Sequence, residues 1–152
     1  GMSVELPFAP VDTVIRRNAG DLRVSAEAAE ELARRIQERG AALATHAAER
    51  ATADGRKTLM AEDFDDVVAE DVPPTADPEG LELPVAPVDR IARLDIDDSY
   101  RVSMDARVAL AAILERFADR VAAAAATLAR HADRRTVKAE DVAVYFELAD
   151  YF

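Results

Sequence analysis

The sequence contains no cysteine and no tryptophan, and only 5% of its residues are aromatic. Without cysteine there is no disulfide framework, no thiolate nucleophile and no cysteine metal site. No apolar run is long enough to cross a membrane, and no signal-peptide pattern is present. We therefore expect a soluble cytoplasmic protein. Lysine is also scarce, because only Lys57 and Lys138 among the 19 basic residues are lysine.

Half of the residues are hydrophobic, and alanine is plentiful. With so few aromatic residues, this composition favours closely packed helices over sheets. The net charge of −11 and the sequence pI of about 4.6 argue against a nucleic-acid binder, which is usually basic. However, acid-rich and lysine-poor composition is typical of proteins from salt-accumulating halophiles, where net charge reflects the solvent. The alternative interpretation is an ordinary acidic interaction protein.

The sequence repeats itself, with three landmarks returning in the same order. The displacement is 77 residues at the first landmark (82 − 5) and 78 at the other two (101 − 23 and 134 − 56). Matched landmarks in one order indicate an internal duplication. The landmarks are residues 5–12 and 82–89, residues 23–25 and 101–103, and residues 56–64 and 134–142.

Each repeat predicts a short helix, a long helix and a closing helix, separated by short extended segments. Pro10 and Pro87 are suited to begin the short helices, predicted over 10–17 and 87–94. Ser25 and Ser103 are predicted to cap the long helices, which end near Ala53, where Asp54-Gly55 follows, and near residue 131. Apolar residues recur along them at helical spacing: Ala28, Leu32, Ile36, Leu43 and Ala47 in the first, and Leu110, Ile113, Leu114, Phe117, Val121 and Leu128 in the second. The closing helices are expected over 61–70 and 139–149. The fold class is therefore all-α.

The proline-rich, acidic stretch between the repeats cannot continue a helix. We expect a first unit over residues 2–71, a linker over 72–80 and a second unit over 81–152. Units of this size bury only a small core alone, so packing the two together is the favourable route to stability.

This pattern resembles the histone fold, and the motifs resemble those of archaeal histones. The matching motifs are Glu-Leu-Pro-x-Ala-Pro-Val, Arg-Val-Ser, and the run from Ala129 to Asp141. The resemblance implies two tandem histone folds whose long helices cross within one polypeptide, as in a histone dimer. Fusion makes this pairing intramolecular.

The resemblance also implies double-stranded DNA as the partner, held mainly by phosphate contacts from paired loops and short helices. An arginine of the first loop reaches the minor groove, a chemistry that suits sequence-tolerant binding and bending. Thr13 and Met60 stand where the second repeat has a basic residue, which weakens the expectation of tight wrapping. The expected DNA-binding residues are Arg16, Arg23, Lys57, Thr58, Arg90, Arg93, Arg101, Arg135, Thr136 and Lys138.

Two further sets follow from the resemblance. Arg56 with Asp63, and Arg134 with Asp141, match a structural ion pair that ties a loop to the closing helix. Leu128, His131 and Asp141 match positions where two dimers meet in a four-helix bundle. The first repeat has Arg50 and Ala53 in place of the first two, which predicts self-association through the second repeat alone. His131 as an ordinary helix-end residue is the alternative.

No nucleophile–base pair, glycine-rich phosphate loop or metal-spaced ligand set is present, so we expect neither an enzyme nor a cofactor or metal. Two functions remain open. One is a nucleoid-associated DNA-binding protein with a chromatin or transcription-regulatory role. The other is a histone-fold module for protein–protein interaction with little DNA binding.

Overall fold

The structure, a computed structural model, describes residues 3–67 and 78–152. The first repeat forms α1 (Phe8–Ala19), β1 (Arg23–Val24), α2 (Ala26–Ala53), β2 (Thr58–Leu59) and the 3-10 helix η1 (Ala61–Val67). A 3-10 turn, η2 (Pro78–Gly80), precedes the second repeat. That repeat forms α3 (Val85–Ala92), β3 (Arg101–Val102), α4 (Met104–His131), β4 (Thr136–Val137) and α5 (Ala139–Ala149).

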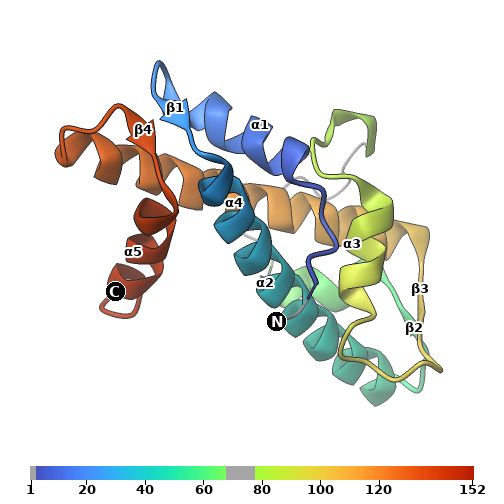
Figure 1. The fold of residues 1–152 in the computed structure, drawn as a ribbon. Coiled ribbons are helices and arrows are strands. Elements are labelled where there is room, and N and C mark those ends of the chain that lie inside the picture. Colours follow the sequence, from blue (N-terminus) through green and yellow to red (C-terminus); the bar gives the residue numbers. More distant parts are fainter. Residues whose placement is uncertain (1–2, 68–77) are drawn as a thin grey trace.

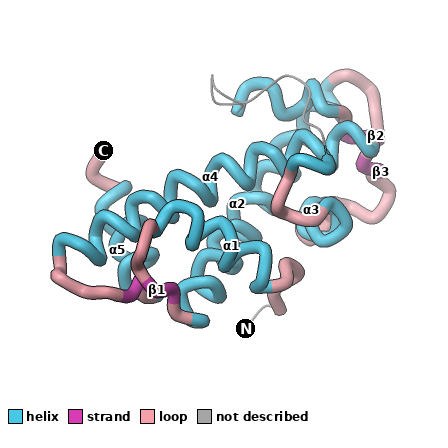
Figure 2. The backbone as a smooth tube through the Cα atoms, turned by 90° about the horizontal axis from the view of Figure 1, so that it is seen from above, coloured by secondary structure: helices cyan, strands magenta, loops and turns pink. Residues whose placement is uncertain are grey.

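The long helices α2 and α4 cross and run in opposite directions, so each end of the molecule holds one loop from each repeat (Figure 1). The strand β1 pairs in parallel with β4, and β2 pairs in parallel with β3. Figure 2 shows the two strand pairs at opposite ends of the crossed helices. The molecule is therefore an intramolecular pair of histone folds, which confirms the predicted fold class.

Small side chains fill the core where the long helices approach each other. All five apolar positions predicted for α2 are buried, and so are most of those in α4. The closest approach involves Gly40, where an added Cβ would lie 2.7 Å from Ile91 Cγ2 and 3.0 Å from Leu114 Cδ1. A residue without a side chain at this position lets α3 and α4 pack directly on the α2 backbone.

The long helices begin as predicted. Ser25 and Ser103 have extended backbones, and their hydroxyls accept hydrogen bonds of 3.1 Å from the amides of Ala28 and Ala106. The turn after α2 also fits the prediction, since Gly55 adopts a left-handed φ of 75°. This conformation is accessible to glycine without steric cost.

The predicted boundaries of the short helices were wrong. Both begin two residues before the expected proline, with Pro7 and Pro84 as the capping residues. Pro10 and Pro87 occupy the third helical position, where the backbone N–H has no intrahelical acceptor in any case. A proline there does not prevent an earlier start. In addition, α1 extends to Ala19, whereas α3 ends at Ala92.

The first closing helix also differs from the prediction, because η1 is a 3-10 helix and not an α-helix. Its sequence, Ala-Glu-Asp-Phe-Asp-Asp-Val, carries four carboxylates in seven residues, and aspartate is a weak helix former. Residues 68–70 of the predicted helix and residues 72–77 of the predicted linker lie outside the described residues. Within the described part, no helix is long and apolar enough to span a membrane.

Candidate nucleic-acid interface

At one end of the molecule, β1 and β4 bring loop residues of the two repeats together. Arg23 is opposite Thr136 in the ladder, and its amide donates to the carbonyl of Arg135 at 2.9 Å. The side chains of Arg23, Arg135 and Lys138 are exposed. None of these three side chains forms an ion pair with another side chain that the structure describes. The structure therefore brings together four of the predicted DNA-binding residues, Arg23, Arg135, Thr136 and Lys138.

The opposite end repeats this arrangement with different neighbours. Thr58 is opposite Arg101, and the Arg101 amide donates to the carbonyl of Lys57 at 2.8 Å. Arg101 is exposed, while the Lys57 ammonium lies 4.3 Å from the centre of the Tyr100 ring. The Tyr100 hydroxyl also contacts the hydroxyl of Thr52. A cation over an aromatic face is held by about 0.5–1 kcal/mol at an exposed site, so Lys57 is pre-positioned but still accessible.

The predicted arginines of the short helices are engaged with carboxylates. Arg16 Nε lies 2.5 Å from Asp12, and Arg93 Nε lies 3.1 Å from Asp89. Arg90 Nε donates to Glu5 of the other repeat at 3.0 Å. A phosphate would have to compete with these carboxylates. The loop ends therefore hold the more available positive charge, and the short helices between them hold less.

Beneath each loop lies a partly buried ion pair. Arg56 donates to both oxygens of Asp63, at 2.8 and 2.9 Å, and the Met60 amide donates to the same carboxylate at 2.7 Å. The Arg56 hydrogen bond, and then the Met60 amide, hold the pKa of Asp63 below its usual value despite burial. In the second repeat, Arg134 contacts Asp141, which also accepts from the Lys138 amide at 2.8 Å.

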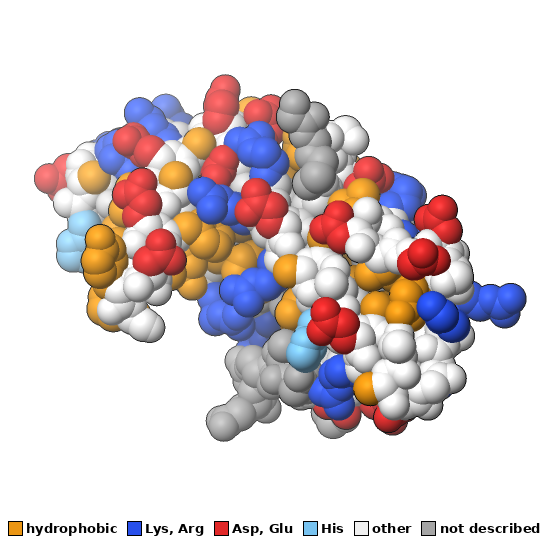
Figure 3. Space-filling model, turned by 90° about the horizontal axis from the view of Figure 1, so that it is seen from below, with side chains coloured by type: hydrophobic (Ala, Val, Ile, Leu, Met, Phe, Trp, Pro, Cys, Tyr) orange, Lys and Arg blue, Asp and Glu red, His pale blue; other side chains and the backbone are white. Residues whose placement is uncertain are grey.

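The residues predicted for self-association lie around the last turns of α4. His131 is exposed and Leu128 is half-buried. Asp141 is only 3% exposed and its carboxylate already serves Arg134. Beside them an open apolar groove of about 540 Å³ is lined by Ala124, Thr127, Leu128, Tyr145, Leu148, Ala149 and Phe152. Figure 3 shows hydrophobic side chains gathered at the end of the molecule that carries α5.

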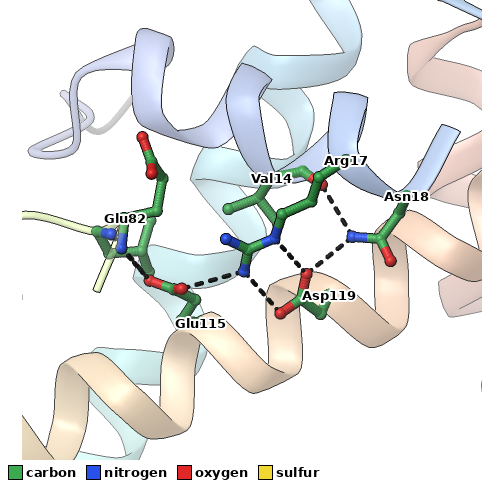
Figure 4. Close-up of polar contacts among 7 residues, drawn as sticks. Val14, Arg17, Asn18, Glu82, Glu115 and Asp119 are labelled. Atoms are coloured by element: carbon green, nitrogen blue, oxygen red, sulfur yellow. Dashed lines mark hydrogen bonds and ion pairs between the residues drawn. The ribbon is translucent and has the colours of Figure 1, made fainter. Parts of the chain in front are cut away.

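Sequence reasoning missed a polar cluster between α1 and α4. Arg17 contacts Glu115 and Asp119 of the other repeat, and Asn18 donates to Asp119 (Figure 4). It also missed Arg130, which donates to the Ala19 carbonyl at 2.9 Å and so ties α1 to α4. Aligning the two repeats position by position would have singled out Arg17, Glu115 and Asp119, because the equivalent positions of the other repeat are uncharged.

No group of three or more histidine, cysteine or acidic side chains is placed to hold a metal ion in the described part of the chain. The arrangement offers two patches of positively charged side chains at opposite ends of crossed helices, with backbone ladders fixing their relative positions. Two such patches suit contact with an extended polyanion. The crossed long helices and the strand pairs define the chain as a protein of two paired histone folds.

Comparison with known proteins agrees with this class. The family model described as histone-like transcription factor (CBF/NF-Y) and archaeal histone matches residues 4–68 and again residues 81–144. The chain belongs to this family. It is 54% identical over 61 residues to the archaeal histone HAN1 of Thermococcus zilligii, a match covering 40% of this chain and 88% of that relative. That relative is therefore about as long as one repeat.

The fold is also similar to the crystal structure of the histone from Methanopyrus kandleri. The TM-score is 0.67 and the sequence identity is 28%, with 90% of each chain covered. Family membership supports a DNA-binding chromatin protein in general terms.

Proposed function

We propose that this protein binds and bends duplex DNA with little sequence preference, through its two loop ends. The observation that carries the proposal is the placement of accessible cations on paired loops at opposite ends of the molecule. The β1–β4 end supplies Arg23, Arg135, Thr136 and Lys138, and the β2–β3 end supplies Lys57, Thr58 and Arg101. Membership of the archaeal histone family is the basis for proposing that the bound duplex is bent.

The spacing of the ends suits a duplex. Each long helix has 28 residues, which corresponds to about 42 Å at 1.5 Å per residue. One turn of B-DNA is about 34–36 Å, so two ends of one molecule reach groove positions roughly one turn apart. Arg23 and Arg101 occupy equivalent positions in β1 and β3, and we assign them to the minor groove. Such contacts read groove width and deformability, with little base readout.

The acidic composition limits how much of this binding is ionic. With a slope near −0.9 per phosphate neutralised, six contacts would lose about five decades of affinity over a tenfold rise in salt. The short-helix arginines, already paired with carboxylates, contribute less than the loops. We therefore propose a local, regulatory role on the nucleoid in preference to global packaging, with groove insertion supplying the salt-resistant part.

The test is binding to a labelled duplex of about 60 base pairs, titrated in potassium chloride from low to molar concentration. The double variant Arg101→Ala/Arg135→Ala should weaken binding on the order of 50-fold at 0.1 M salt, since two ionic contacts are lost. Its helicity by circular dichroism should be unchanged. Arg34→Ala, which removes an exposed arginine paired within α2, is the matched control. Equal affinity of the double variant and this control would contradict the loop-end proposal.

The second candidate function is a protein-interaction module, and the apolar groove beside α5 favours it. We propose that a second copy of the chain covers this face, with Leu128 and His131 in the contact, giving an assembly of four folds. Absence of DNA binding at every salt concentration, with the protein folded, would make the interaction module the better account.

A further inference from the structure

The polar cluster between α1 and α4 is one of several contacts that join the two repeats. Arg17 donates to Asp119 through Nε at 3.0 Å and through Nη2 at 2.8 Å, and Nη2 also donates to Glu115 at 3.0 Å. Asn18 Nδ2 donates to Asp119 at 2.8 Å. Figure 4 shows these side chains of α1 pointing toward the two carboxylates of α4. Glu115 is 7% exposed, so its charge lies largely out of water.

Burial alone would raise the pKa of Asp119, but the hydrogen bonds from Arg17 and Asn18 outweigh it and lower this pKa. Arg17 contacts both carboxylates, the buried Glu115 and the partly exposed Asp119. A carboxylate withdrawn from water and left without its cation is strongly destabilising.

The repeat places different residues at the equivalent site. Equivalent residues of the two repeats are 77 positions apart in the short helices (93 − 16) and 78 positions apart in the long helices (103 − 25). The equivalent of Arg17 is therefore Leu94, and the equivalents of Glu115 and Asp119 are Gln37 and Ala41. The equivalent of Asn18 is Asp95, so the second junction has no arginine at this site and no carboxylate at positions 37 and 41 to receive one.

Gln37 and Glu115 share one structural task. Gln37 accepts from the Glu5 amide at 2.8 Å and donates to the Ser3 carbonyl at 2.9 Å. Glu115 accepts from the amides of Glu82 and Leu83, at 2.7 and 2.9 Å, through Oε1. Each side chain thus anchors the segment before its own short helix. The anchoring can be done by a neutral amide, so the charge of Glu115 needs another explanation.

The alternative pairings supply that explanation. In a pair of two second repeats, Leu94 would take the place of Arg17 opposite Glu115 and Asp119. Both carboxylates would then lose the guanidinium that faces them, and Arg116 of α4 would act on Asp119 as it does now. In a pair of two first repeats, Arg17 would face Gln37 and Ala41 and would lose its ionic partners. Only a first repeat paired with a second repeat satisfies both junctions.

We propose that Arg17, Glu115 and Asp119 form a pairing determinant that makes the second repeat accept the first repeat and reject another second repeat. The discrimination comes mainly from the cost of the wrong pairing, which leaves Glu115 and Asp119 without the Arg17 guanidinium. The segment that joins the repeats favours pairing within one chain, and the cluster decides which repeat is accepted. The proposal does not depend on DNA binding.

Disulfide reporters in the full chain test this directly, because introduced cysteines are the only thiols present. Arg23→Cys/Thr136→Cys reports the observed pairing, since these positions are opposite each other in the β1–β4 ladder. Arg101→Cys/Thr136→Cys reports a pair of two second repeats, in which β3 of one chain would lie beside β4 of another. Opposed positions in neighbouring strands lie within the Cα separation that a disulfide requires.

Each reporter is refolded under thiol exchange at about 1 mM protein, near the effective concentration of a short flexible tether. In the native background, the first reporter should close within one chain and the second should give few covalent dimers. In the Glu115→Gln/Asp119→Ala background, covalent dimers of the second reporter should increase about tenfold. The carboxylates that oppose this pairing are then absent. Glu38→Gln/Glu49→Gln removes the same charge from exposed positions of α2 and should leave the dimer fraction as in the native background.

A second variant adds a cation and leaves Arg17, Glu115 and Asp119 unchanged. Leu94→Arg, at a position already 37% exposed, should also increase covalent dimers of the second reporter several-fold. Closure of the first reporter in each background shows that the chain still folds. A dimer fraction that stays unchanged in both Glu115→Gln/Asp119→Ala and Leu94→Arg would overturn the proposal, and the joining segment alone would then set the pairing.

Discussion

At the scale of single residues, the carboxylates of this acidic chain have separate structural tasks. Asp63 and Asp141 each accept from an arginine seven residues earlier and from a backbone amide at the start of the closing helix. Each therefore holds one loop against its closing helix. Conversely, Asp12, Asp89 and Glu5 lie on the surface and reduce the charge of arginines in the short helices.

Asp63→Asn should lower the free energy of unfolding at neutral pH by about 2 kcal/mol, because charge-assisted hydrogen bonds to a buried carboxylate are lost. The pKa of Asp63 is lowered in the folded state, so its contribution is complete above the unfolded pKa of about 3.9 and is lost as pH falls through the lower, folded value. Denaturant unfolding between pH 7 and pH 2 should therefore show a smaller acid-dependent loss in the variant. Asp21→Asn, at an exposed position, is the control, and identical pH curves for wild type and Asp63→Asn would contradict the assignment.

The role of a residue could be predicted from the sequence where its residue type is suited to one local geometry, such as a helix cap or a left-handed turn. Ser25, Ser103 and Gly55 lie where the sequence placed them because capping and left-handed turns are local properties. The partners of Arg17 were not predictable in this way, because Glu115 and Asp119 are about 100 residues distant and meet it only after the repeats pair. The assignment of Arg56, Asp63, Arg134 and Asp141 to folding stays a prediction for mutagenesis, although the structure contains both contacts.

At the scale of helices and strands, the crossing of α2 under α3 and α4 depends on Gly40. Gly40→Val should destabilise the protein by about 1–3 kcal/mol, since the added atoms overlap the stiff β-branched side chain of Ile91. The small gain in helix propensity over glycine does not offset this overlap. Thermal or denaturant unfolding measures the difference against Ala42→Val, at an exposed position of the same helix. Equal stability of these two variants would show that the helices can separate without cost.

Within the short helix α1, the Asp12–Arg16 ion pair is expected to limit contact with DNA. Asp12→Asn frees Arg16 from its 2.5 Å partner, so DNA affinity at low salt should rise several-fold and the salt slope should steepen by about one contact. Glu38→Gln removes one negative charge from α2 and controls for the change in net charge. A rise of the same size in both variants would mean that net charge alone acts, and that Arg16 does not approach a phosphate.

The order of the elements was predictable, and so were the bounds of the long helices and of α5, but the starts of the short helices and the type of η1 were not. Both short helices begin before their proline, because Pro10 and Pro87 tolerate the third helical position as well as the first. The 3-10 geometry of η1 was not visible in the hydrophobic pattern, because Phe64 is buried in either helix type. Strand pairing across repeats followed from the family resemblance, since two-residue strands carry too little pattern to be paired by sequence alone.

At the scale of the whole molecule, a net charge of −11 must coexist with two cationic ends. At 1 M salt the Debye length is about 3 Å, so long-range repulsion between DNA and the acidic surface is screened along with long-range attraction. Short-range contacts of arginine in a groove then have the larger relative effect. This balance agrees with our proposal that arginines of the loop ends enter the groove. The unit boundaries at residues 71 and 81 stay predictions.

The residues at the end of α4 differ from the equivalent residues of the first repeat. This difference predicts an assembly that stops at two chains. His131 is exposed and Leu128 half-buried beside the apolar groove, whereas the first repeat has Ala53 and Arg50 at the equivalent positions. We expect two chains to associate through the second repeats only. Light scattering after size exclusion should then give twice the mass of one chain at high protein concentration.

Leu128→Ala/His131→Ala should shift this mass to that of a single chain, because the variant removes apolar area and a polar contact from the centre of the proposed interface. His46→Ala, which removes the exposed histidine of the first repeat, should leave the mass unchanged. Asp141 is unsuitable for this test, since its loss would also break the Arg134 contact beneath the loop. A wild-type mass of one chain at every concentration, or a doubled mass that survives Leu128→Ala/His131→Ala, would place any self-association elsewhere on the molecule.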